Sequence, residues 1–155
     1  MKDSENQVCR VPVVDDEPTV GRAIKMLLQF DGHEVQTVDS GEAALALLEQ
    51  RQFDVVITDF SLLGMKGDQL AARIKQRWPD QPIIMATAYA EVFSTFGKAH
   101  GDVDFLLQKP FSQVELREAI ISVLTRKNPN SNSGLNIASG QPPPVNFIPP
   151  PNPQP

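Results

Sequence analysis

Five short apolar segments alternate with five segments of helical periodicity between residues 10 and 127, and this alternation constrains the fold more than any other feature. Most of the apolar segments are rich in β-branched residues, which favour strands. The predicted strands are residues 10–14, 34–38, 54–58, 82–86 and 103–107. Strands that alternate with helices form a parallel sheet with helices on both faces. We therefore predict an α/β fold with a doubly wound, five-stranded parallel sheet.

Apolar residues recur at helical spacing in the segments between the strands. Pro18 suits the first position of a helix, where its missing N–H costs nothing. Ser40 can cap the second helix, and Ser112 with Glu115 has the pattern of a capping box. The predicted helices are residues 18–31, residues 40–50, a third around residues 70–74 that stops near 78–79, residues 91–100, and residues 112–126.

Composition divides the chain near residue 128. All 14 basic and 19 acidic residues precede this point, and nine of the 14 prolines follow it. We therefore predict a flexible N-terminus at residues 1–9, a folded domain at 10–127 and a disordered tail at 128–155. The tail is either an inert extension or a docking segment anchored by Val145, Phe147 and Ile148. The remaining length leaves no room for a second domain with its own core, so we expect either a stand-alone domain or a fragment of a longer protein.

Composition also excludes several classes of protein. No apolar run is long enough to span a membrane, and the first residues lack the apolar core of a signal peptide. A single cysteine, Cys9, and two histidines cannot build a structural zinc site. The net charge of -5 disfavours direct binding to nucleic acid. We expect a cytoplasmic protein that contacts neither membrane nor nucleic acid.

Residues that can carry chemistry follow four of the predicted strands. Asp15 and Asp16 follow the first strand, Asp59 the third, Thr87 the fourth and Lys109 the fifth. Taken singly, each is more often a helix cap, a turn residue or a solvated loop residue. Ligands of doubly wound sheets, however, bind beyond the carboxyl ends of the strands. We therefore expect these five side chains to meet at one edge.

Such a cluster indicates a metal and a phosphoryl group. Three carboxylates repel one another, and a hard divalent cation relieves the repulsion. Mg²⁺ keeps coordination positions open for phosphate oxygens. An aspartate can itself accept a phosphoryl group as nucleophile, and Asp59 is the candidate because it stands alone after the most buried strand. Asp15 and Asp16 suit the ion, while Lys109 and Thr87 can contact phosphoryl oxygens.

The ordered set of these residues resembles the receiver domain of two-component response regulators, the CheY-like family. The matching segments are VVDDE at 13–17, DVVITD at 54–59, ATA at 86–88 and KPF at 109–111. The resemblance covers residues 10–127 and leaves out the tail. It implies a flavodoxin-like sheet with the strand order 2-1-3-4-5.

The resemblance also implies a function. Asp59 would be phosphorylated by a sensor histidine kinase or a phosphotransfer protein, and Thr87 and Lys109 would respond to the phosphoryl group. The implied ligands of Mg²⁺ are Asp15, Asp16, Asp59 and the backbone carbonyl of Ser61. The response would reach the face made by the fourth helix, fifth strand and fifth helix, where a downstream protein or a second copy of the chain would bind. Such a protein is a signalling phosphoacceptor, and an enzyme only in its own phosphorylation and dephosphorylation.

Three positions depart from the family pattern. The residue three before the lysine is usually aromatic and here is Leu106; either a one-residue insertion brings Phe105 into place, or the aromatic coupling is lost. Leu63 stands near a position where proline is usual. Pro12 removes a hydrogen-bond donor from a strand that should be central, so we expect a local distortion there.

Two other functions are weighed against the phosphoacceptor. A phosphorylation-independent interaction module on the same fold would account for the departures, but it has no need of three repelling carboxylates. A phosphohydrolase with an aspartyl nucleophile would need a substrate pocket and a cap, for which the chain is short.

Overall fold

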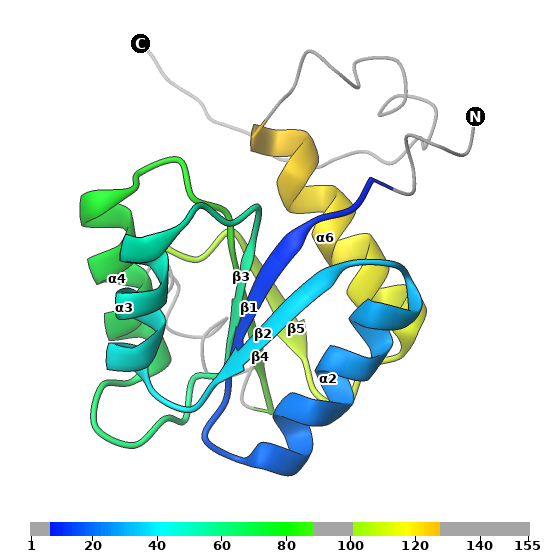
Figure 1. The fold of residues 1–155 in the computed structure, drawn as a ribbon, viewed down its shortest axis with the longest axis horizontal. Helices are drawn as coiled ribbons and strands as arrows, with labels where there is room; N and C mark the ends of the chain where they lie inside the picture. Colours follow the sequence, from blue (N-terminus) through cyan, green and yellow to red (C-terminus); the bar gives the residue numbers. More distant parts are fainter. Residues whose placement is uncertain (1–6, 89–100, 128–155) are drawn as a thin grey trace, which may run out of the picture. The chain divides into compact units, whose positions relative to one another are not determined.

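The computed structural model describes residues 7–88 and 101–127, which form five strands and four helices (Figure 1). The strands are β1 (Arg10–Val14), β2 (Glu34–Val38), β3 (Val56–Thr58), β4 (Ile83–Thr87) and β5 (Phe105–Gln108). The helices are α2 (Pro18–Phe30), α3 (Gly41–Gln50), α4 (Gly67–Arg77) and α6 (Gln113–Lys127). The helix predicted at residues 91–100 and the tail predicted at 128–155 lie outside the described residues.

The five strands form one parallel sheet in the order β2-β1-β3-β4-β5. β1 pairs with β2 along its whole length, from Arg10 opposite Glu34 to Val14 opposite Val38. In Figure 1, α2 and α6 lie on one side of the sheet and α3 and α4 on the other. The predicted doubly wound, flavodoxin-like fold is therefore confirmed.

Two apolar clusters fill the space between the sheet and the helices, one on each face. The first, between the sheet, α2 and α6, includes Val13, Ile24, Ile57, Leu116 and Ile120. The second, between the sheet, α3 and α4, includes Val14, Leu48, Val56, Leu70 and Ile74. Successive strand residues thus enter opposite clusters, and both are buried. Burial on both faces explains why the strands have nearly continuous apolar sequences.

The ladder between β1 and β3 is irregular at the level of Pro12. N–H groups two residues apart in a regular strand point to the same neighbour. Here Asp54 donates to the Arg10 carbonyl at 2.9 Å, whereas Val56 donates to the Pro82 carbonyl, on the β4 side, at 3.0 Å. Pro12 lies two residues after Arg10, so it also faces β3, but it has no N–H to donate. β3 therefore begins at Val56, two residues later than predicted, while the β1–β2 register continues through Pro12.

Local signals set the starts of the helices. Ser40 Oγ accepts a hydrogen bond from the Ala43 N–H at 3.1 Å, as its predicted capping role requires. Ser112 Oγ accepts from the Glu115 N–H at 3.1 Å, and the Glu115 carboxylate accepts from the Ser112 N–H at 2.9 Å, which confirms the capping box. No helix within residues 7–88 and 101–127 is long and apolar enough to cross a membrane.

A polar anchor before β5 explains why this strand starts two residues later than predicted. The Asp104 carboxylate accepts from the Ile83 N–H at 2.8 Å and from Lys75 Nζ at 2.9 Å. The Ile83 N–H of β4 is thus bonded to the Asp104 side chain and not to a backbone carbonyl. Regular pairing of the two strands begins with Phe105 opposite Ile84. The contact also ties α4 to the amino ends of β4 and β5.

Burial predicts unequal effects for two leucine substitutions near α4. Leu70 is fully buried in the second cluster, whereas Leu63 is 78% exposed. Leu70→Ala should lower the free energy of unfolding by about 2–5 kcal/mol, because it removes buried methyl groups and leaves a cavity. Leu63→Ala, the matched control, should stay within about 0.5 kcal/mol of the unaltered protein. Urea unfolding at neutral pH measures both, and equal losses would contradict the assigned core.

Candidate functional site

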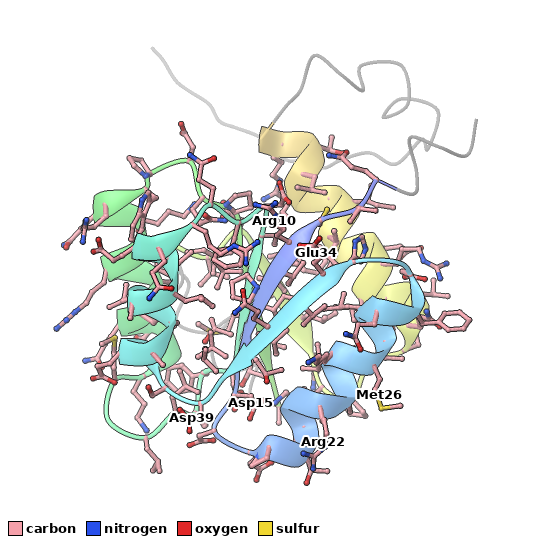
Figure 2. The ribbon with its side chains drawn as sticks, viewed as in Figure 1. Arg10, Asp15, Arg22, Met26, Glu34 and Asp39 are labelled. Atoms are coloured by element: carbon pink, nitrogen blue, oxygen red, sulfur yellow. The ribbon has the colours of Figure 1, made fainter. Side chains whose placement is uncertain are left out.

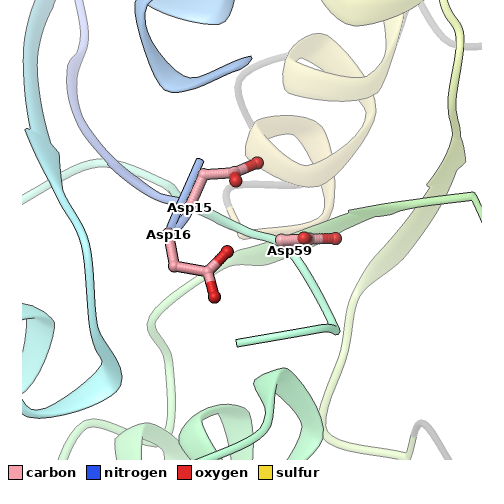
Figure 3. A group of neighbouring side chains, drawn as sticks. All are labelled: Asp15, Asp16 and Asp59. Atoms are coloured by element: carbon pink, nitrogen blue, oxygen red, sulfur yellow. The ribbon is translucent and has the colours of Figure 1, made fainter. Parts of the chain in front are cut away.

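The carboxyl ends of β1 and β3 bring three acids together at one edge of the sheet. Asp15 and Asp16 follow the end of β1, and Asp59 follows the end of β3. The Asp59 N–H donates to the Val14 carbonyl at 3.0 Å, so the pairing of the two strands continues to the acids. One carboxylate oxygen from each acid lies within 4.8 Å of the others (Figure 3). No other group of three or more acids, histidines or cysteines comes this close within the described part of the chain.

Asp15 is the most buried of the three acids, and both of its carboxylate oxygens are engaged. Its side chain is 2% exposed. Oδ1 accepts from the Glu17 N–H at 2.9 Å, and Oδ2 accepts from Lys109 Nζ at 3.1 Å. The Glu17 carbonyl in turn accepts from the first turn of α2. Asp15 therefore links the start of α2 to the end of β5.

Lys109 carries the positive charge that enters the acid cluster. It follows β5, and its N–H donates to the Thr87 carbonyl at 2.9 Å, which extends the β4–β5 pairing. Its Nζ lies 3.1 Å from Asp15 Oδ2 and 3.5 Å from Asp59 Oδ1. β3 and β4 stand between β1 and β5 in the sheet, so the lysine side chain spans the carboxyl edge to reach these acids.

Asp59 lies in an environment that disfavours its charge. Burial raises the pKa of its carboxyl, Lys109 opposes that shift, and the neighbouring charge of Asp15 raises the pKa further. Oδ1 also accepts from the Phe60 N–H at 2.9 Å. Oδ2 accepts no hydrogen bond from the described residues. Within the described part of the chain, Oδ1 of Asp59 is thus held in place, whereas Oδ2 has no hydrogen-bond donor.

Asp16 connects the acids to the loop that follows β3. Its Oδ2 accepts from the Leu63 N–H at 3.2 Å, a contact for which the sequence contains no signal. Gly64 follows with a φ of 82°, a left-handed conformation that glycine adopts readily. The loop therefore turns beside the cluster while the Leu63 side chain remains exposed.

Gly67 supports Asp59 from the start of α4, a role that sequence reasoning missed. Its N–H donates to the Phe60 carbonyl at 2.9 Å. A Cβ at this position would lie 2.2 Å from the backbone oxygen of Asp59, far inside van der Waals contact. No pattern in the sequence indicates this role. Glycine is required at position 67 because of its contact with Asp59, eight residues earlier in the chain.

Thr87 and Ser61 occupy the regions predicted for them. Thr87 is the last residue of β4 and is fully buried at the edge that carries the acids. Ser61 is exposed in the loop after Asp59. The role of the Thr87 hydroxyl and that of the Ser61 carbonyl stay predictions.

The aromatic position before Lys109 is occupied by Leu106. The β4–β5 register runs without interruption from Phe105 to Gln108, so no inserted residue shifts Phe105 toward the lysine. Phe105 instead packs against the cluster between the sheet, α2 and α6. Of the two alternatives that the sequence left open, the structure favours the loss of the aromatic side chain.

The donor set of the cluster suits a hard divalent cation. Three carboxylates and one ammonium leave an excess of negative charge at this edge, and all of the donor atoms are oxygens. Mg²⁺ prefers such oxygens and retains open coordination positions. The residues present therefore fit this ion, and the partly buried Lys109 beside them can receive an anionic group.

Comparison with known proteins identifies the family that the sequence motifs resemble. The model of the response regulator receiver domain matches residues 11–121. The heme response regulator HssR of Staphylococcus aureus (strain Newman) is 38% identical over 127 residues, which cover 82% of this chain and 56% of HssR. The chain thus spans just over half the length of this relative.

Solved structures agree in fold. The response regulator protein TrrA from Thermotoga maritima, in complex with Mg²⁺-BeF, is 34% identical and has a TM-score of 0.69, with 74% of this chain and 98% of TrrA covered. A response regulator receiver domain protein from Clostridium thermocellum is 29% identical with a TM-score of 0.72, covering 79% of this chain and 99% of that protein.

The close approach of Gly67 to Asp59 predicts the effect of a single methyl group. Gly67→Ala should lower the free energy of unfolding by about 1–3 kcal/mol, since the backbone of α4 or of Asp59 must shift. Gly41→Ala is the matched control, because Gly41 also begins a helix but its Cβ would first meet the Met65 sulfur, at 2.9 Å. That side chain can move, so the control should lose less stability. Chemical denaturation of both variants tests this order, and a larger loss at Gly41 would contradict it.

The electrostatics of Asp59 predict that its neutralisation stabilises the protein. Asp59→Asn removes a carboxylate whose ionised form is disfavoured by burial and by Asp15. We expect the free energy of unfolding at pH 7 to rise by about 0.5–2 kcal/mol, as at other sites where function maintains strain. Thermal and urea unfolding without divalent cations give the comparison. A loss of stability would mean that the ion pair with Lys109 outweighs the burial of the charge.

Proposed function

The chain belongs to the response regulator receiver family, and we propose that Asp59 accepts a phosphoryl group from a sensor histidine kinase or a phosphotransfer protein. Receiver domains of this family are signalling modules. The Asp59 carboxylate carries the proposal, because Phe60 and Lys109 hold Oδ1 while Oδ2 accepts no hydrogen bond from the described residues. A held carboxylate with one available oxygen suits a nucleophile.

In the proposed reaction, Oδ2 of Asp59 attacks the phosphorus atom of a phosphohistidine. The bond between phosphorus and the imidazole nitrogen breaks, and its electron pair remains on the imidazole, which takes up a proton. The products are an acyl phosphate on Asp59 and an unmodified histidine on the donor. The Lys109 ammonium, 3.5 Å from Oδ1, offsets charge on the transferred group.

Mg²⁺ is the proposed cofactor, in keeping with the Mg²⁺-BeF complex of TrrA. Its proposed ligands are Asp15, Asp16, Asp59 and the backbone carbonyl of Ser61. When bound, the ion would neutralise charge on the acids and on phosphoryl oxygens. Asp16 would add its charge from the loop side, where it also accepts from Leu63.

Lys109 and Thr87 are the proposed link between Asp59 and partner binding. A phosphoryl group would add about -1.5 to -2 charges beside Lys109, which is shared between Asp15 and Asp59. The added charge would draw the ammonium from Asp15 toward the phosphoryl oxygens, and the Thr87 hydroxyl would donate to another of them. The backbone bond from Lys109 to Thr87 would pass the change to the ends of β4 and β5. The proposed output face combines β5, α6 and the helix predicted at residues 91–100, with a downstream protein or a second copy as its occupant.

One observation favours a second candidate function, a phosphorylation-independent interaction module. Leu106 fills the position where receivers usually carry an aromatic residue, so the usual coupling from the site to β5 lacks its side chain. On this alternative the same face binds its partner in a fixed conformation. Partner affinity that is unchanged by a phosphodonor would favour it over the phosphoacceptor.

Phosphorylation of Asp59 predicts a specific change in mass. Incubation with Mg²⁺ and acetyl phosphate should add one phosphoryl group, and Asp59→Asn should stay unmodified, as measured by intact-mass spectrometry. Asp16→Asn should require at least about tenfold more Mg²⁺, because it loses a charged ligand.

The matched control is Asp39→Asn. Asp39 follows β2 at the same end of the sheet as Asp15 but stands outside the acid cluster (Figure 2). This variant should react like the unaltered protein. Absence of the adduct on the unaltered protein, or equal modification of Asp59→Asn, would rule out the proposed acceptor.

A further inference from the structure

A histidine holds the residue that precedes β1. The Cys9 N–H donates to His33 Nδ1 at 3.0 Å, and the Cys9 carbonyl accepts from the Glu34 N–H at 2.9 Å. Both backbone polar groups of Cys9 are therefore bonded to the α2–β2 turn and the start of β2. Arg10 and Glu34 mark this end of the sheet, opposite to the end that carries Asp15 (Figure 2).

The bond between Cys9 and His33 requires a neutral imidazole. Nδ1 can accept a hydrogen bond only when the ring proton is on Nε2. In the imidazolium form both ring nitrogens carry hydrogen, and the Cys9 N–H would face a second donor. Burial lowers the pKa of His33, while the charges of Asp31 and Asp54 oppose that shift. The neutral form is thus the one that the folded surroundings favour.

The charged groups around His33 are already engaged with other partners. Asp31, at the end of α2, accepts from Gln113 and Arg117 of α6. Asp54, before β3, accepts from the Arg10 N–H at 2.7 Å. In β2, Glu34 lies 3.4 Å from the Arg10 guanidinium and 4.0 Å from that of Arg51. No ion pair joins His33 to an acid within residues 7–88 and 101–127, so no direct partner offsets the lost bond when a proton binds.

We propose that the protonation state of His33 decides whether the segment that leads into β1 stays bound to the α2–β2 turn (the fastened state) or separates from it (the released state). In its neutral form His33 holds Cys9 against the α2–β2 turn. Protonation removes the acceptor and releases Cys9 together with Gln7 and Val8. This inference concerns the end of the sheet remote from the acids and does not depend on phosphorylation of Asp59.

The direction of the pH effect follows from proton linkage. The released imidazole binds a proton with an ordinary pKa of about 6.5, whereas the fastened imidazole has a lower pKa. The released state therefore binds more protons, and release becomes more favourable as pH falls below about 6.5. A single proton changes the equilibrium by at most tenfold per pH unit. Between pH 7.5 and 5.5 the expected increase is up to about tenfold.

Cys9 serves as an internal reporter of release. It is the only cysteine of the chain and is fully buried in the fastened state. Burial, with a smaller contribution from Asp54, raises the pKa of its thiol to about 11, so the folded thiol is protonated across the pH range of interest. Labelling with 4,4′-dithiodipyridine, which reacts with thiols in mildly acidic solution, measures exposure. The labelling rate of urea-unfolded protein at each pH corrects for the chemistry of the thiol.

The full chain should show pH-dependent protection of Cys9 that requires His33. Protection should fall from pH 7.5 to 5.5 in the unaltered protein, by up to about tenfold. His33→Asn keeps an acceptor oxygen near the place of Nδ1 but takes up no proton, so its protection should not change over this range. Constant protection in the unaltered protein, or an equal fall in His33→Asn, would overturn the proposal.

A second variant separates release from unfolding. His33→Ala lacks the acceptor at every pH, and its protection at pH 7.5 should already be as low as that of the unaltered protein at pH 5.5. Circular dichroism should show that both variants remain folded at both pH values. Full protection in folded His33→Ala would overturn the proposal, as would labelling of the unaltered protein at the rate of global unfolding.

Discussion

The contact of Lys109 with Asp15 and Asp59 is the interaction on which the candidate site depends. Two acids with side chains only 2% and 13% exposed lie beside one another, so their negative charges would repel at short range. One ammonium within 3.5 Å of both offsets that repulsion. Removal of the ammonium would leave both carboxylates without a positive partner in the described part of the chain. The lysine follows the last strand and the acids follow the first and third, so only the assembled sheet creates this contact.

The sequence was sufficient to predict this assembly because one physical rule links pattern and site. Strands buried on both faces have continuous apolar sequences, as at Val13, Val14 and Ile57, and they alternate with helices only in a parallel sheet. The carboxyl ends of parallel strands meet at one edge. Asp59 and Lys109 give no functional signal when each is taken singly. The alternation of strands and helices nevertheless predicts that their side chains lie close together.

Other features depended on information that the sequence does not contain. Pro12 predicts a local distortion of the first strand, but the sequence does not show that the distortion delays the start of β3 to Val56, which depends on the direction in which the Asp54 N–H points. Gly67 is required by the backbone of Asp59, and the bond from Leu63 to Asp16 uses an N–H that every residue except proline has. His33 likewise carries no sequence signal of its bond to Cys9. These contacts involve the backbone, and a pattern of side chains identifies backbone partners only where they belong to regular elements.

Pro12 makes the central strand uneven along its length. Toward the acids, the β1–β3 pairing runs without interruption through the Asp59 N–H. At the opposite end Pro12 has no N–H to donate, and the regular alternation of N–H directions in the chain leading into β3 is broken between Asp54 and Val56. The amino ends are held instead by two bonds between Arg10 and Asp54, at 2.7 and 2.9 Å. The regular pairing next to the acids keeps the backbones of Asp15 and Asp59 in register with each other, independently of the irregular ladder at the far end.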